Sequence, residues 1–333
     1  MDERSCFEGI IHEVKYSMCT LRSNTPQEVE KHVSNVIDSL NWKNIITSDM
    51  KVLIKPNFTK EIHEPGVTTS PIVLKALVKY ISGWGNEITI IEGNGGSWSF
   101  DATQSAFNHG VKELKEEFGV KWVNISNLPR TKYSSKIIKK NLTLELPKDI
   151  DKIGDILISL PVFKTHCITK VTLGIKNLWG LIPSEMRMLN HSKLKWYLPL
   201  LGNYFNHQLT LIDGTIGLEG NGPMRGDKIE MNTIFGSNDP VIADIIGALL
   251  MKIDPRAVDH IVHYAKHMDI EIDTIISKVL EDISDFQVEF NMKRNFSNYL
   301  DLITFKSRFI SKIVFDSPLT SIIYFLFNLI NGS

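Results

Sequence analysis

Four potentially cationic side chains lie within thirteen residues of one another: Lys164, His166, Lys170 and Lys176. They follow an apolar run, 155–163, that predicts a buried strand. Cations at a strand end, next to the free N–H groups of a helix start, suit a carboxylate or a phosphate. Neighbouring cations lower the pKa of His166 and keep its imidazole neutral, as a base acting near pH 7 requires. We therefore predict that His166 transfers a proton and that Lys164 and Lys176 act beside it; a structural histidine is the alternative.

Polar and glycine residues also follow the other predicted strands. In open parallel sheets, ligands bind beyond the carboxyl ends of the strands, where loops from distant parts of the chain meet. The sequence therefore predicts one pocket formed by the segments around positions 55, 94, 165, 221 and 238. The predicted substrate-binding residues are Lys55, Asn57, Asn94, Gly95, Gly96, Lys170, Asn177, Asn221 and Arg225.

Four carboxylates in the same loops could hold a divalent cation if they converge: Glu92, Asp213, Glu219 and Asp239. Spacing alone does not show that they do. Asp239 stands directly before Pro240, a pair that is equally typical of a helix start.

The three cysteines, Cys6, Cys19 and Cys167, are too few and too scattered for a disulfide framework or a four-thiolate iron–sulfur cluster. We therefore expect no iron–sulfur cluster and a reduced, cytoplasmic location. The acidic N-terminus has no apolar segment, so it is not read as a signal peptide.

Composition excludes further classes of protein. The 333 residues are 43% apolar and 23% charged, with a net charge of −1, which predicts a folded protein that does not bind nucleic acid. The sequence EGNGG (92–96) is not the dinucleotide fingerprint G-x-G-x-x-G, and the chain contains no P-loop motif.

Strand-like and helix-like segments alternate along the chain. Apolar runs at 51–58, 87–92 and 120–126 predict strands, and the segments 70–85 and 101–119 predict the helices between them. This alternation predicts an α/β fold with a mainly parallel sheet of βαβ units and a helical C-terminal extension. The expected organisation is a first α/β region (1–150), a second one that carries most motif loops (151–270), and the extension (271–333).

Two shorter segments have sequence patterns of other kinds. The segment 127–150 alternates as a hairpin or connector does, and 167–182 is helix-like but interrupted by glycine. On such a helix, His166, Lys170 and Asn177 would share one stripe.

The segment 319–330 is almost entirely apolar and follows several basic residues. Twelve residues are too few to span a bilayer. We expect a terminal helix that docks on the protein body or in a homo-oligomer interface; the alternative is peripheral membrane contact.

The ordered motifs KPNF (55–58), EGNGG (92–96), LPVFKTH (160–166), DGTIGLEGNGPMRG (213–226) and SNDPVIAD (237–244) resemble the family called domain of unknown function 362. The resemblance covers roughly residues 50–255. It implies an α/β fold whose motif loops form one site, and it supplies no reaction. Many relatives carry a ferredoxin-like module with Cys-x-x-Cys runs, which this sequence lacks.

A weaker similarity links the chain to the nickel-pincer lactate racemase family. In that family, comparable residues hold a nickel cofactor or move protons or hydride. Here His166, Lys170 and Lys176 match, and the second catalytic histidine has no clear counterpart.

Together these features predict an enzyme that acts on a small anionic metabolite, carboxylated or phosphorylated, by acid/base chemistry, with metal assistance as an option. A non-catalytic metabolite-binding protein is one alternative. A racemase or epimerase with a nickel-type cofactor is the other.

Overall fold

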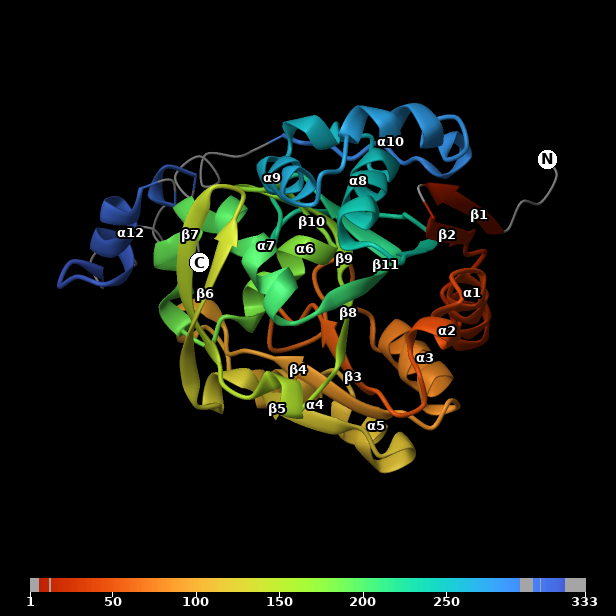
Figure 1. Cartoon of the computed structure of the whole chain (residues 1–333), viewed down its shortest axis with the longest axis horizontal. Helices are drawn as coiled ribbons and strands as arrows, with labels where there is room; N and C mark the ends of the chain where they lie inside the picture. Colours follow the sequence, from red (N-terminus) through yellow and green to blue (C-terminus); the bar gives the residue numbers. More distant parts are fainter. Residues whose placement is uncertain (1–5, 12, 294–301, 306, 321–333) are drawn as a thin grey trace.

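A parallel sheet forms the centre of the computed structural model, which describes residues 6–11, 13–293, 302–305 and 307–320 (Figure 1). Its strands lie in the order β11 (His207–Glu219), β8 (Ile156–Leu160), β3 (Lys51–Pro56), β4 (Glu87–Glu92) and β5 (Lys121–Asn124). Neighbours in this series run parallel. Since parallel strands need crossover connections, this order confirms the predicted α/β fold with a mainly parallel sheet.

Antiparallel strands extend the sheet beyond β11. Strands β13 (Thr233–Ser237), β2 (Val14–Thr20) and β1 (Cys6–Ile11) continue it to one edge, and β12 (Asp227–Ile229) pairs with the far end of β11. Strands β13, β11 and β8, from the predicted second region, lie together in the middle of this sheet, and strands of the first region flank them on both sides, so the regions 1–150 and 151–270 share one sheet.

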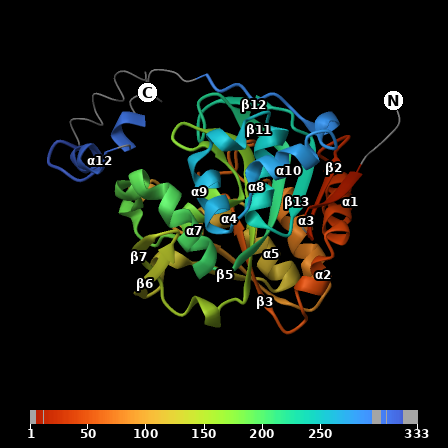
Figure 2. The ribbon, with the colours of Figure 1, turned by 45° about the horizontal axis from the view of Figure 1, so that its top comes forward.

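Helices cover both faces of this sheet, as the two views show (Figures 1 and 2). One face packs against α1 (Pro26–Ser39), α3 (Pro71–Ser82) and α5 (Val111–Phe118), and a separate apolar core fills the space between. The central strands are buried on both sides. Val52 and Ile54 of β3 belong to this core and Leu53 belongs to the other, as alternation along a strand requires.

The second face packs against helices from the C-terminal half. They are α6 (Gly174–Asn177), α7 (Leu194–Tyr204), α8 (Pro240–Leu250), α9 (Asp259–His267) and α10 (Ile272–Val279). Every residue of α8 is buried, which agrees with a sequence that is apolar apart from Asp244. Shorter helices are α2 (Trp42–Ile45), α4 (Ala102–Asn108) and α12 (Arg308–Phe315). In both views α12 lies at the opposite side of the molecule from β1.

The segment predicted as a glycine-broken helix, 167–182, is mostly not helical. Strand β9 (Val162–His166) turns into β10 (Lys170–Thr172), and only then do α6 and a 3-10 turn (Leu178–Leu181) follow. Four of the five residues from 168 to 172 are β-branched, and the fifth, Lys170, has a φ of 66°, which a helix does not allow. The predicted helical stripe of His166, Lys170 and Asn177 is therefore wrong, because His166 lies opposite Lys170 in a hairpin.

Other boundaries differ for local reasons. The predicted strand 155–163 ends at Leu160 and β9 begins two residues later, because Pro161 has no N–H for the sheet. Gly110 has a φ of 85° and divides the predicted helix 101–119 into α4 and α5. The segment 127–150 contains the expected hairpin, formed by β6 (Arg130–Ile137) and β7 (Lys140–Pro147).

The expectation of unpaired cysteines is wrong for two of them. Cys6 and Cys19 form a disulfide because β1 and β2 pair in the register that places them directly opposite each other. Their separation in sequence gave no sign of that register. Cys167 is buried and is not part of a disulfide.

Within the part of the chain that the structure describes, no helix has the length and apolar character needed to cross a membrane. The predicted apolar segment 319–330 lies almost wholly outside the described residues.

Asp213 connects β11 to the start of α3. Its buried carboxylate accepts hydrogen bonds from the backbone N–H of Ser70 at 2.7 Å and from Thr215 N and Oγ1 at 2.9 and 2.7 Å. We predict that Asp213→Ala lowers the free energy of unfolding by on the order of 2–4 kcal/mol, because three buried donors lose their acceptor. Urea denaturation measures the loss. Glu116→Ala, on the exposed side of α5, is the control and leaves the urea midpoint nearly unchanged.

Candidate active site

A cavity of about 230 Å³ lies at the carboxyl ends of β3, β4 and β9. Segments from five parts of the chain line it: 55–59, 92–100, 164–180, 187–191 and 223–224. The predicted meeting of segments near positions 55, 94, 165 and 221 therefore occurs. The segment near 238 lies elsewhere: Asn238 accepts a hydrogen bond from Trp42 and donates one to the carbonyl of Leu40, and Asp239 caps α8.

Lys55 and Glu92 form a buried ion pair at the floor of the cavity. The Lys55 Nζ lies 2.6 Å from Glu92 Oε2, and it also donates to Asn177 Oδ1 at 3.1 Å and to the carbonyl of Pro56 at 2.7 Å. Glu92 accepts further bonds from the N–H groups of Phe58 and Gly93. Burial lowers the pKa of Lys55, and Glu92 opposes that shift.

The turn that follows α6 closes tightly over this ion pair. A Cβ atom on Gly180 would lie 2.5 Å from Glu92 Oε1 and 3.2 Å from Lys55 Nζ. No side chain fits at this position unless the ion pair moves.

Lys164 is surrounded in the same way. Its Nζ lies 2.7 Å from both Asn57 Oδ1 and the carbonyl of Val67, and 3.3 Å from Thr59 Oγ1. Burial, together with Lys176 and Lys55, lowers its pKa well below the ordinary value. Because an amine has at most three N–H donors, Lys55 and Lys164 have none left for a ligand. They shape the electrostatic potential of the cavity without contacting its contents.

Lys176 differs from these two lysines. Among the described residues it has no hydrogen-bond acceptor and no ion-pair partner, although it is only 8% exposed. Burial, followed by the charge of Arg187, lowers its pKa to about 7; the sulfur of Cys167 opposes this shift, and Lys55 adds to it. At neutral pH the amine is therefore divided between its charged and neutral forms.

Arg187 is the second buried cation with donors to spare. One terminal nitrogen donates to the carbonyl of Asn94 at 2.8 Å and the other to the carbonyl of Ser184 at 3.4 Å. It forms no ion pair within the described ranges. Glu92, already paired with Lys55, is the one acidic residue among the described residues that line the cavity. The cavity is therefore short of negative charge.

The two histidines of the cavity present opposite groups to it. His166 Nδ1 accepts from the N–H groups of Ile168 and Thr169, at 3.1 and 3.4 Å, so the neutral ring carries its proton on Nε2. His191 Nδ1 lies 2.8 Å from the carbonyl of Met188, so this ring carries its proton on Nδ1 and has a lone pair on Nε2. Burial and nearby cations lower the pKa of His166 well below its ordinary value and that of His191 to about 3.

Seven of the twelve predicted catalytic and binding positions line this cavity directly: Lys55, Asn57, Gly96, Lys164, His166, Lys176 and Asn177. Asn94 and Gly95 lie just behind it. Asn94 bonds to the N–H of Ala102 and to Glu185, and a Cβ on Gly95 would collide with Ser99. Lys170, Asn221 and Arg225 are not among the lining residues.

The four predicted metal ligands do not converge. Glu92 pairs with Lys55, Asp213 holds the start of α3, Glu219 accepts from the N–H of Asn291, and Asp239 caps α8 through the N–H groups of Val241 and Ile242. Among the described residues, the group that could hold a metal ion is instead Cys6, Cys19 and His32.

Several lining residues were not predicted, above all Arg187 and His191, with the apolar walls Phe58, Phe100, Trp179 and Met188. Arg187 and His191 lie in a 3-10 segment, η5 (Glu185–Lys193), that follows no strand. A search restricted to strand ends therefore could not find them.

The Lys55–Glu92 pair allows a comparison between a buried and an exposed charge. We predict that Lys55→Met lowers the free energy of unfolding by about 3–5 kcal/mol, because Glu92 is left buried and unpaired. Lys75→Met removes the partner of Glu117, where both side chains are nearly half exposed, and costs far less. Urea denaturation measures both free energies of unfolding. If the two variants lose the same amount, the Lys55–Glu92 pair is not a buried ion pair that the fold depends on.

Lys176 is predicted to lower stability where it is charged. Its pKa is about 7 in the folded chain and 10.5 when exposed, so the unfolded state binds the extra proton between these values. The free-energy cost of burying the charged amine is complete below pH 7, and it vanishes as the pH rises towards 10.5. Lys176→Met should therefore stabilise the protein by on the order of 2–4 kcal/mol near pH 6 and by much less near pH 9.

Lys170→Met is the control for this measurement, because Lys170 lies outside the cavity. Denaturation series at several pH values should give no pH-dependent difference for it. A Lys176→Met effect that is the same at every pH would show that the amine is not displaced from its ordinary pKa.

Comparison with known proteins gives three matches. A thylakoid-associated protein of Synechocystis sp. is 26% identical over 225 residues, which are 65% of this chain and 67% of that protein. The lactate racemase apoprotein of Thermoanaerobacterium thermosaccharolyticum superposes with a TM-score of 0.44 and 14% identity over 70% of this chain. A protein from Thermotoga maritima gives 0.36 and 11% over 59%. The chain spans 56% and 51% of the length of these two solved structures.

The family model described as Domain of unknown function (DUF362) matches residues 52–249, more than half of the chain. This range includes β3, β4, β9 and α8, and with them most of the residues that line the cavity. The resemblance that the motifs predicted is confirmed, and the chain belongs to the DUF362 family.

Proposed function

We propose that this protein is an enzyme that binds a small carboxylated or phosphorylated metabolite and moves a proton on it. The observation that carries the proposal is Lys176: a buried amine at the wall of a cavity, with a pKa of about 7 and with no hydrogen bond or carboxylate partner among the described residues. Buried charges are normally paired, and strongly displaced pKa values are frequent at catalytic groups.

The charge of the cavity supports an anionic ligand. Lys176 and Arg187 both lack a carboxylate partner within the described part of the chain, and both are at least nine-tenths buried. A carboxylate or phosphate would supply the missing negative charge, and a guanidinium suits either of these groups. The cavity volume of about 230 Å³ is below the roughly 300–1,000 Å³ typical of drug-sized ligands, which favours a metabolite of few heavy atoms.

Proton transfer is assigned to Lys176 in its neutral form. The amine accepts a proton from the bound metabolite, and the Nε2–H of His166 donates a hydrogen bond to the oxygen on which negative charge develops. This assignment changes the predicted role of His166. Since backbone N–H groups occupy its Nδ1, the neutral ring acts as a donor and not as the base. Arg187 binds and orients the anionic group.

A screen in D₂O tests this proposal without knowledge of the product. The protein is incubated with small carboxylates and phosphorylated metabolites, and deuterium incorporation is followed by NMR. We expect at least one compound to gain deuterium at a carbon-bound position, with a rate that rises as the pH increases through about 7. A compound that binds but gains none would support the alternative, a non-catalytic binding protein.

Two substitutions separate binding from proton transfer. Lys176→Arg keeps a positive charge but no group that is neutral near pH 7, so exchange should fall by about a hundredfold or more while the anion still binds. His166→Ala should lower the exchange rate about a hundredfold and leave the pH midpoint unchanged, since it removes a donor and not the base. Unchanged exchange in the Lys176 variant would refute its role.

Peripheral membrane contact is proposed for the C-terminal region, with the remainder of the protein in the cytoplasm. The name of the Synechocystis relative supports it, as do the exposed Phe309 (74%) and the basic Arg308 and Lys312 on α12. Deletion of 307–333, which removes α12 together with the apolar segment, should release the protein from membrane fractions. Unchanged fractionation would rule the contact out.

A further inference from the structure

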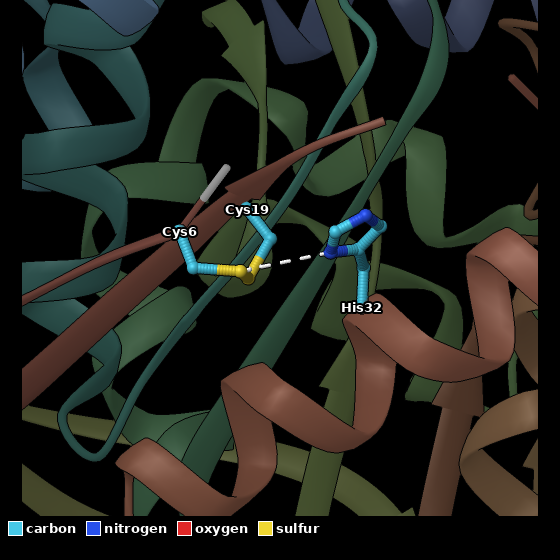
Figure 3. A group of neighbouring side chains, drawn as sticks. All are labelled: Cys6, Cys19 and His32. Atoms are coloured by element: carbon cyan, nitrogen blue, oxygen red, sulfur yellow. Dashed lines mark hydrogen bonds between the residues drawn. A yellow bond between two sulfur atoms is a disulfide. The ribbon is translucent and has the colours of Figure 1, made fainter. Parts of the chain in front are cut away.

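A second group of reactive side chains lies at the edge of the sheet, outside the candidate active site. Cys6 on β1 and Cys19 on β2 face His32, which projects from α1 (Figure 3). Cys19 and His32 are buried, and Cys6 is partly exposed. None of the three lines the cavity described above.

Glu28 fixes the orientation of the His32 ring. Its carboxylate Oε1 lies 2.9 Å from His32 Nε2, and a carboxylate can only accept, so Nε2 carries the proton. The lone pair of Nδ1 therefore faces the sulfur of Cys6, 3.6 Å away. A disulfide sulfur has no hydrogen to donate. In the oxidised state, this buried nitrogen, on a residue 1% exposed, therefore has no hydrogen-bond donor among the residues that the structure describes.

The distances suit a metal ion in the reduced state. The ligand atoms of Cys6, Cys19 and His32 all lie within 4.8 Å of one another. In a tetrahedral zinc site with usual bond lengths, the sulfur and nitrogen ligands are about 3.6 Å apart, and the Cys6 Sγ to His32 Nδ1 distance is 3.6 Å. The nitrogen is already in place, and only the two sulfurs would have to separate.

The surroundings match those of known metal ligands. A metal-bound histidine usually donates its other N–H to a carboxylate, which orients the ring, as Glu28 does here. Thiolates and an imidazole together favour Zn²⁺ and similar soft or borderline ions. Asn35 Nδ2 lies 3.7 Å from Cys6 Sγ, where it can stabilise a thiolate. Exposure of Cys6 leaves room for water as a fourth ligand.

We propose that the reduced Cys6–Cys19 pair and His32 form a binding site for Zn²⁺ or a similar divalent ion, and that disulfide formation abolishes it. In the oxidation of the ion-bound state, the two thiolates lose two electrons and form the S–S bond. A low-molecular-weight disulfide accepts both electrons, its own S–S bond breaks, and it leaves as two thiolates that take up protons from water. The bound ion leaves in the same step, because neither sulfur remains a thiolate.

Cobalt titration of the full chain tests the site. The protein is reduced with a phosphine, freed of reductant without oxygen, and titrated with Co²⁺ alone. We expect one equivalent to bind, with a thiolate-to-cobalt charge-transfer band in the near ultraviolet and visible bands typical of tetrahedral cobalt. Oxidised protein should give neither band. Zn²⁺ should displace the cobalt and remove both bands.

Variants assign the ligands. Cys19→Ser should abolish the charge-transfer band or reduce it by half or more, and Cys167→Ser should leave it intact. Glu28→Gln should weaken Co²⁺ binding by about 10- to 100-fold. Glu30→Gln, on the same helix and paired with Lys79, is the matched control and should bind as the unmodified chain does.

Three results would overturn the proposal: a reduced, folded protein that binds no Co²⁺, a charge-transfer band that keeps its full intensity in Cys19→Ser, or equal affinities for the Glu28 and Glu30 variants. Circular dichroism on each sample establishes that the protein is folded. If the reduced protein binds no Co²⁺ and the Cys6–Cys19 disulfide re-forms readily on oxidation, the two cysteines are a structural cross-link only.

Discussion

The burial of the Lys55–Glu92 ion pair is the constraint on which the site depends. Two opposite charges at the carboxyl ends of adjacent parallel strands are stable in the interior only if their remaining donors and acceptors are satisfied. Here Asn177, from α6, and the backbone of residues 56–58 and 93 satisfy them. The pair therefore fixes the position of α6 against the sheet, and α6 carries Lys176.

The three lysines of this cavity are all buried, and their roles differ because their hydrogen-bond acceptors differ. Lys55 and Lys164 are each surrounded by three acceptors, so they contribute charge and rigidity. Lys176 is also buried, at 8% exposed, but has no such acceptors in the described part of the chain, which leaves its N–H donors available to a ligand. The sequence shows three similar lysines, and only their partners distinguish a structural cation from a reactive one.

Sequence reasoning predicted the parts of this protein that depend on local pattern. Apolar runs predicted β3, β4 and β5, the segment 70–85 predicted α3, and polar strand ends predicted Lys55, Asn57, Lys164, His166 and Lys176 as site residues. Sequence reasoning failed for features that depend on contacts between distant parts of the chain. The pairing of β9 with β10, the register of Cys6 with Cys19, and the approach of η5 to the cavity all arise from tertiary contacts. The four carboxylates show the same limit, since each has a separate structural partner that no spacing reveals.

The space beside Glu92 has a consequence for related chains. Because hydrogen is the largest substituent that position 180 accommodates next to the ion pair, the two positions cannot vary independently. A side chain at 180 would require a shorter acid at 92, which would draw the carboxylate back from the turn and lengthen its bond to Lys55. Covariation of these two positions, 88 residues apart in the chain, is thus the evolutionary signature that this contact should leave.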